Sequence, residues 1–161
     1  MGVITPTFTL TSNASSASTD AGPISIALSL SVTDALTVDL VQSKIVTPAN
    51  SGAPTLLLSG NDYAGDGADT AGTHGSFLYL KNATASGAAV IYVGTVLQGT
   101  AAPANMGAEG TALDHADDAT FRLMTLRVGE FCWMPWDYMQ DIYVGASSGS
   151  QSLEYFLFDR G

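Results

Sequence analysis

The chain has 161 residues, a length that fits one domain able to bury roughly 70% of the surface that its unfolded form would expose. Its net charge of −10 comes from fifteen acidic and five basic residues, so the phosphate contacts of a nucleic-acid-binding protein are not expected, and anionic membranes are poor partners. The lone Cys132 has no second cysteine to pair with, so stability has to come from apolar burial.

The N-terminal third shows the two-residue period of β-strands. Apolar residues alternate with threonines over residues 4–10, where Pro6 places the strand at a sheet edge. After a loose stretch at 12–22, alternation returns without a fault over 24–32. It resumes at 36–40 after Thr33-Asp34-Ala35, which we interpret as the turn of a hairpin or a bend in one strand.

Short apolar runs separated by Gly, Ser, Asn and Asp fill the rest of the chain, and none has sustained helical periodicity. We expect strands at residues 55–59, 77–81, 90–93, 121–128, 142–144 and 153–158. The connections at 82–88 and 145–151 are short and rich in small residues, which favours hairpin loops. Those at 60–76 and 95–120 are long enough that function is expected there before elsewhere outside the core. Ile-Tyr-Val-Gly occurs at Ile91 and again at Ile142, a possible mark of two equivalent strands.

These elements predict an all-β protein, an antiparallel β-sandwich or jelly-roll-like single domain with long loops. Residues 1–22 are expected to form an N-terminal edge strand and a loop or arm. Residues 23–161 are expected to form the β-sandwich domain, with a long inserted loop at about 95–120.

Acidic residues gather between positions 61 and 69, where Asp62, Asp66 and Asp69 are the candidate ligands for a hard cation such as calcium. An EF-hand starting at Asp62 would need an oxygen donor at Ala64 and a bidentate Glu at Thr73, and neither is present. A solvated turn is therefore the favoured interpretation, and neither a metal nor any other cofactor is predicted.

The sequence holds no complete signature of an enzyme active site. His115 lies between carboxylates in Asp-His-Ala-Asp-Asp, but neighbours in an extended loop seldom converge on one ion. Gly145-Ala-Ser-Ser-Gly149 matches the Gly-x-Ser-x-Gly pattern, but no helical periodicity follows it, as a nucleophile elbow requires, and no phosphate-binding Gly-rich motif occurs. Cys132 lies between Phe131 and Trp133, the setting of a packed thiol. We therefore predict no catalytic residue and no enzyme activity.

Bulky groups concentrate in Val-Gly-Glu-Phe-Cys-Trp-Met-Pro-Trp, residues 128–136, and continue at Tyr138 and Met139. The favoured interpretation is core, with a strand ending at Pro135 and with Trp133 and Trp136 closing one end of the sandwich. The alternative is a partner interface in which exposed loop residues act as anchors. Its candidates are Trp136, Tyr138 and Met139, together with Met106 in the long connection.

Several segments of the C-terminal half resemble small virion structural proteins of tailed phages, especially cyanophage-like ones. They are Phe-Leu-Tyr-Leu-Lys-Asn at 77–82, Ile-Tyr-Val-Gly at 91–94, Leu-Arg-Val-Gly-Glu-Phe-Cys-Trp-Met-Pro-Trp at 126–136, Ile-Tyr-Val at 142–144 and Leu-Glu-Tyr-Phe-Leu-Phe at 153–158. The 95–120 segment departs from the short connection usual in such proteins.

The resemblance implies a non-enzymatic capsid decoration or cement protein, assembled on the virion in the host bacterial cytoplasm. Its partners would be the major capsid protein lattice and neighbouring copies of itself, with the arms at 1–21 and 95–120 lying across subunit seams. A tail, neck or fibre-associated virion protein is the first alternative. A carbohydrate-binding β-sandwich module is the second, with Trp133, Trp136 and Tyr138 stacking on sugar rings and the aspartates of residues 62–69 bonding sugar hydroxyls.

Overall fold

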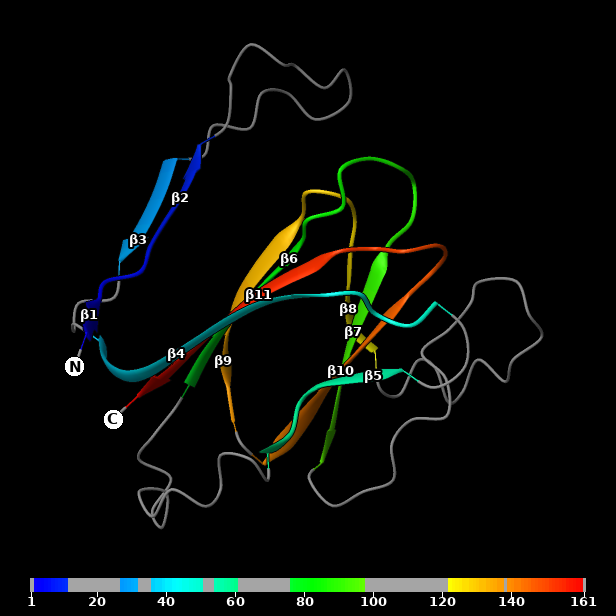
Figure 1. The fold of residues 1–161 in the computed structure, drawn as a ribbon. Helices are drawn as coiled ribbons and strands as arrows, with labels where there is room; N and C mark the ends of the chain where they lie inside the picture. The colour runs from blue at the N-terminus through cyan, green and yellow to red at the C-terminus, as the bar shows by residue number, and fades with distance from the viewer. Residues whose placement is uncertain are drawn as a thin grey trace. The chain divides into compact units, whose positions relative to one another are not determined.

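The computed structural model describes residues 2–11, 27–31, 36–50, 54–60, 76–97, 122–137 and 139–160. Its regular secondary structure in these ranges is a series of β-strands (Figure 1). The chain divides into two compact units, residues 1–39 and 40–161. The all-β expectation is therefore confirmed, while the division falls later in the chain than the boundary expected at 22/23.

The first unit is made of short antiparallel pairs. β2 (Thr7–Thr11) pairs with β3 (Ala27–Ser31), and β1 (Gly2–Ile4) pairs with the first residues of β4 (Leu36–Val46), Gly2 opposite Val38. β3 and β4 therefore lie in different sheets, and the hairpin considered between them is wrong. Because β3 pairs with β2, residues 27–31 belong to the N-terminal unit.

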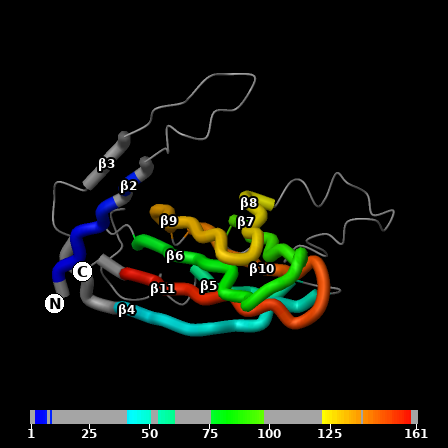
Figure 2. Tube along the Cα trace, turned by 90° about the horizontal axis from the view of Figure 1, so that it is seen from above, coloured from blue at the N-terminus to red at the C-terminus, as the bar shows by residue number. Residues whose placement is uncertain are grey.

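The second unit contains two antiparallel four-stranded sheets, in the orders β4-β11-β6-β9 and β5-β10-β7-β8; Figure 2 shows the first four in that order. Their bounds are β5 (Thr55–Leu58), β6 (Ser76–Asn82), β7 (Ile91–Leu97), β8 (Arg122–Leu126), β9 (Phe131–Trp136), β10 (Gln140–Ala146) and β11 (Leu153–Arg160). Four pairs of consecutive strands place one strand in each sheet, and in both sheets they follow the same order: β4-β5, β10-β11, β6-β7 and β8-β9. This is the strand order of a jelly roll.

The short connections of this unit cross between the sheets, which overturns the hairpins predicted at 82–88 and 145–151. They are tied to one another by hydrogen bonds: Ala83 N donates to Ser152 O at 2.8 Å, and Ser147 N donates to Val90 O at 3.0 Å. A small-residue loop of six to eight residues can span the two layers as readily as it closes a hairpin, so loop composition alone could not distinguish them.

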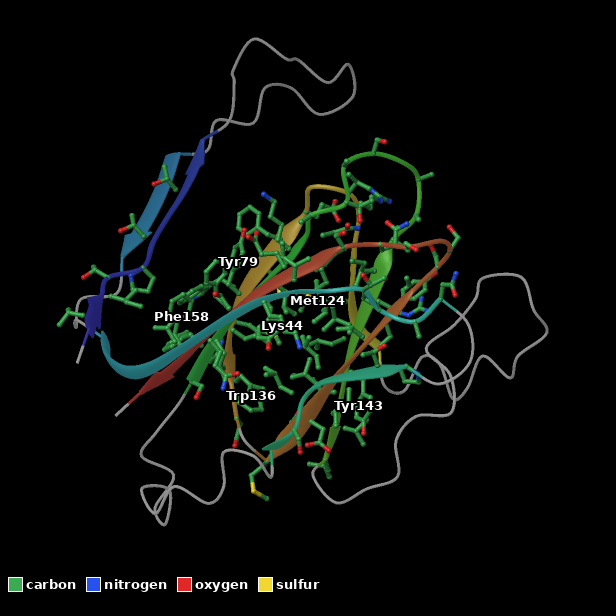
Figure 3. All side chains as sticks on the ribbon, viewed as in Figure 1. Lys44, Tyr79, Met124, Trp136, Tyr143 and Phe158 are labelled. Atoms are coloured by element: carbon green, nitrogen blue, oxygen red, sulfur yellow. The ribbon has the colours of Figure 1, made fainter. Side chains whose placement is uncertain are left out.

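The core lies between the two sheets because every second residue of each strand points inward. On β6 the buried positions are Ser76, Leu78, Leu80 and Asn82. The two leucines pack with apolar residues of the other strands: Leu58, Ile91, Val93, Leu126, Trp136, Ile142, Val144, Leu153, Tyr155 and Leu157. Figure 3 shows Met124 and Trp136 between the layers, whereas Tyr79 and Phe158 lie on the opposite side of their sheet.

The repeated Ile-Tyr-Val-Gly segments form neighbouring strands and pair with each other. Tyr143 of β10 lies opposite Gly94 of β7, and Tyr92 lies opposite Gly145. Each ring thus has a glycine across from it, an arrangement that lets an aromatic side chain cover bare backbone. Tyr92, Tyr143 and Val96 form a second buried cluster, with the guanidinium of Arg122 3.8 Å from the Tyr92 ring centre.

Candidate interaction surface

The sheet β4-β11-β6-β9 has a second apolar face, on the side away from the core. Since alternate residues of β6, β9 and β11 point into the core, the residues between them point outward. Six of these outward side chains are aromatic and are called the aromatic face below: Phe77, Tyr79, Phe131, Trp133, Phe156 and Phe158. A sheet that only covered a core would carry polar residues at these positions.

The rings of the aromatic face contact one another across three strands. Trp133 of β9 stacks on Phe77 of β6 with ring centres 5.4 Å apart, and reaches Phe158 of β11 at 5.2 Å. Tyr79 lies between Phe131 at 5.9 Å and Phe156 at 5.8 Å, while Phe156 and Phe158 are stacked at 6.2 Å. These are the separations of favourable aromatic pairs, so the face is a packed layer with a fixed shape.

Strand register arranges the outward residues in rows across the sheet. One row is Phe158, Phe77 and Pro135, and the next is Phe156, Tyr79 and Trp133. The third row is Glu154, Lys81 and Phe131, which places one carboxylate directly opposite one ammonium group at the end of the face. Burial of the Tyr79 hydroxyl, with a smaller contribution from the Glu154 charge, raises the pKa of Tyr79.

The apolar character continues onto β4, the strand next to β11. Val46 packs against the core, so the two-residue period turns Val41 and Ile45 to the other side. Both are exposed, as are Phe131 (55%) and Trp133 (36%). These four side chains together expose apolar area on the order of 400 Å², about the largest patch that a monomer usually presents, before the other four rings are added.

The edge of this sheet is blunted at β9. The strand continues through Pro135, which lies opposite Phe77, although the sequence predicted that it would end there. Proline has no N–H to donate, and an edge strand tolerates it because its outer side needs no partner. β9 is the last strand in the sheet order, so Pro135 discourages a further strand from pairing there.

On the core side of the same strand, Cys132 lies half-buried opposite Leu80. Burial raises the pKa of the Cys132 thiol, and a hydrogen bond with the Leu80 backbone lowers it by less. The thiol is therefore held in its protonated form at neutral pH, as expected of a packed cysteine.

The predicted partner residues are not brought together. Trp136 is only 5% exposed and belongs to the core, where its Nε1–H donates to Gln140 O at 2.8 Å. The favoured core interpretation is therefore confirmed for Trp136, and the alternative that made it an interface residue is wrong. Met139 is 47% exposed. Tyr138 and Met106 lie outside the described residues. Trp133, expected to close one end of the sandwich, instead lies on the aromatic face.

The aromatic face was missed by the sequence reasoning, although the sequence carries a signal for it. Phe-Leu-Tyr-Leu on β6 and Tyr-Phe-Leu-Phe on β11 are apolar at successive positions, so both faces of these strands are apolar. An antiparallel strand with one solvated face would alternate apolar and polar residues.

Asp62, Asp66 and Asp69 all lie outside the described residues, as do both histidines. Among the residues that the structure does describe, no three His, Cys, Asp or Glu side chains gather as metal ligands would. Within the same ranges, no helix is long and apolar enough to cross a membrane.

Comparisons with protein-family models, with curated protein sequences and with solved structures find no match to this chain.

Proposed function

We propose that this chain is a non-enzymatic structural protein of a tailed-phage particle, and that it acts as a capsid decoration or cement protein. The observation that carries the proposal is the aromatic face. It places six packed rings on the outer side of a jelly-roll sheet, and an apolar patch of this size at a protein surface is typical of an interaction site.

The virion setting is supported by the sequence resemblance, whose segments coincide with β6, β7, β9, β10 and β11. These are the strands that build the aromatic face and its supporting layer. The jelly roll agrees with this setting because the fold recurs in viral capsid proteins, although lectin domains share it.

Binding of this kind needs no reacting group. Aromatic side chains with few rotatable bonds lose little entropy on association and dominate protein interfaces, while charged groups belong at the rim. A small acidic domain that engages the major capsid protein and neighbouring copies of itself would multiply weak contacts into firm attachment, because each contact holds the next at high effective concentration.

A tail, neck or fibre-associated role in the virion uses the same chemistry. It differs only in the partner and in the symmetry of the assembly, so it is separated from decoration by the position of the protein in the particle.

A carbohydrate-binding module is the alternative from a different class. Of the aromatic residues expected to stack on sugar rings, Trp136 lies in the core and is not accessible to a sugar. The rings of the aromatic face also stack on and tilt against one another, and only Tyr79 and Trp133 among them carry a polar group able to hydrogen-bond a sugar hydroxyl. Sugar binding is therefore less well supported than protein binding.

Cryo-electron microscopy of particles carrying this protein tests the proposal. Density for the chain repeated over the capsid lattice is the expected result. Density confined to the tail, neck or fibres would replace decoration by the first alternative. Absence of the chain from the particle would contradict the virion role and leave sugar binding to be tested by titration with oligosaccharides.

A further inference from the structure

We propose that the aromatic face is the contact surface between two copies of this chain, related by a two-fold axis that runs between β6 and β11, parallel to the strands. This deepens the proposed function by naming the surface that joins neighbouring copies. It rests on that function only for its setting in a particle, because the association itself is a property of the chain.

The aromatic face and the apolar residues of β4 beside it are large enough to form an interface between two copies. Stable interfaces bury about 800 Å² on each partner, with an apolar centre of closely packed aromatic groups. Val41, Ile45, Phe131 and Trp133 together supply on the order of half of that area, and the four partly exposed rings beside them extend it.

Charge selects a second copy as the occupant. The chain carries a net charge of −10, so most surfaces of two copies repel each other. The outward positions of β6, β9 and β11 at described side chains hold only Lys81 and Glu154 as charged residues, and their charges cancel. Two such faces can meet without net repulsion.

The position of these two charges makes the face complementary to itself. Lys81 and Glu154 are register partners on adjacent strands β6 and β11. A two-fold axis between those strands lays β6 of one copy over β11 of the other. Lys81 of each copy then lies over Glu154 of its neighbour, as an isologous interface requires.

The same operation pairs the remaining rows of the face. Tyr79 of one copy lies over Phe156 of the other, and Phe77 lies over Phe158, since these too are register partners. The strands of the two copies stay nearly aligned, which is the common way for two sheets to pack face to face, with about 10 Å between layers. Pro135 on the edge strand β9 disfavours the competing edge-to-edge arrangement there.

Charge reversal in the full-length protein tests the inference. Lys81→Glu leaves two carboxylates in the charged row, and Glu154→Lys leaves two ammonium groups. We expect each variant alone to dissociate roughly tenfold more readily than the natural chain, as measured by sedimentation equilibrium at about 1–100 µM. Lys44→Glu is the matched control. It makes the same charge change on β4 at a position that shares a side with Val46, so it should leave the association unchanged.

Mixing the two single variants separates contact between copies from contact within one chain. We expect a heterodimer that is tighter than either homodimer, because two carboxylates then face two ammonium groups across the interface. A mixture no tighter than its parents overturns the inference, as does a natural chain that stays monomeric over this range. A monomer in which Trp133 is nevertheless shielded from a soluble quencher would mean that the chain covers its own aromatic face, and this would overturn it too. Each of these results is obtained without particles, so failure here is distinct from failure of the virion role, which microscopy decides.

Discussion

The indole of Trp133 stacks on the ring of Phe77, with ring centres 5.4 Å apart and planes 18° apart, on the outer side of the sheet β4-β11-β6-β9. Both residues have neighbours in their strands that belong to the core: Leu78 follows Phe77, and Met134 follows Trp133. One sheet therefore carries two apolar layers, one that packs in the core of the domain and one that lies on its outer side.

The two layers should respond differently to truncation. Leu80→Ala removes a fully buried side chain between the sheets and should cost about 2–5 kcal/mol of the free energy of unfolding. Phe131→Ala removes a ring that is 55% exposed and in contact with Tyr79, and should cost about 1 kcal/mol or less. Urea unfolding at a protein concentration that favours the monomer measures both. Equal losses would contradict the division into a core and a surface layer.

Asn82, the last residue of β6, should be a costly polar residue to replace. Its side chain is fully buried, its Nδ2 donates to Leu126 O at 3.0 Å, and its Oδ1 accepts from Thr84 N at 3.2 Å. Asn82→Ala leaves Leu126 O and Thr84 N without these hydrogen-bond partners and should lower the free energy of unfolding by about 1–3 kcal/mol. Ser86→Ala, at an exposed position of the connection that follows β6, is the control. If both variants unfold at the same urea concentration, the buried amide does not tie the sheets together.

The tight connection between β8 and β9 depends on Gly129, whose φ is +81°. A Cβ added there meets no atom within 4 Å, so the cost of Gly129→Ala is backbone strain alone and should be about 1 kcal/mol or more. Gly129→Asn should cost less, because asparagine tolerates the left-handed region better than alanine. A thermal unfolding series would detect this order, and its reversal would show that the turn relaxes in solution.

Much of the strand content follows from alternation, and the sequence predicts it. The runs at 77–81, 90–93 and 153–158 lie within or overlap β6, β7 and β11, because each places a Leu, Ile, Val or Tyr that the core buries at every second position. The layer of each strand could not be predicted in the same way. Residues 82–88 and 145–151 have the small residues of hairpin loops, yet both connect the two sheets, since β6 pairs with β11 and β7 pairs with β10.

The candidate site was harder to predict than the fold because exposure depends on which side of a strand meets the core. Trp133 and Trp136 are three residues apart on β9, so they point to opposite sides. Sequence alone gives both as bulky and aromatic, and the favoured interpretation placed both in the core, which is right for Trp136 and wrong for Trp133. The exposed rings come from β6, β9 and β11, and only the pairing of these strands brings them together.

The Cys132 thiol should make stability fall in alkaline solution. Burial raises its pKa above the ordinary value of 9.0, so the folded chain keeps the proton after the unfolded chain has released it. The contribution of the Cys132 thiol to the free energy of unfolding should be fully present below pH 9.0. It should be lost as the pH rises from 9.0 toward the pKa of the thiol in the folded chain.

Cys132→Ala removes that decline, whatever its effect on stability at neutral pH. Burial also raises the pKa values of Tyr79 and Tyr143 above 10.0, so the slope to compare lies between pH 9.0 and 10.0. Equal slopes for the natural chain and the variant would mean that the thiol is solvated in the folded protein.

Hydroxyl-radical footprinting of Trp133 and Met139 tests the central claim most directly. Both side chains are exposed in the isolated chain, but only Trp133 belongs to the aromatic face. Oxidation of each is compared in dilute protein, in concentrated protein and in intact particles. We expect Trp133 to become protected on assembly while Met139 keeps its reactivity. Protection of Met139 with Trp133 unchanged would contradict the claim and move the interface to the β9–β10 connection.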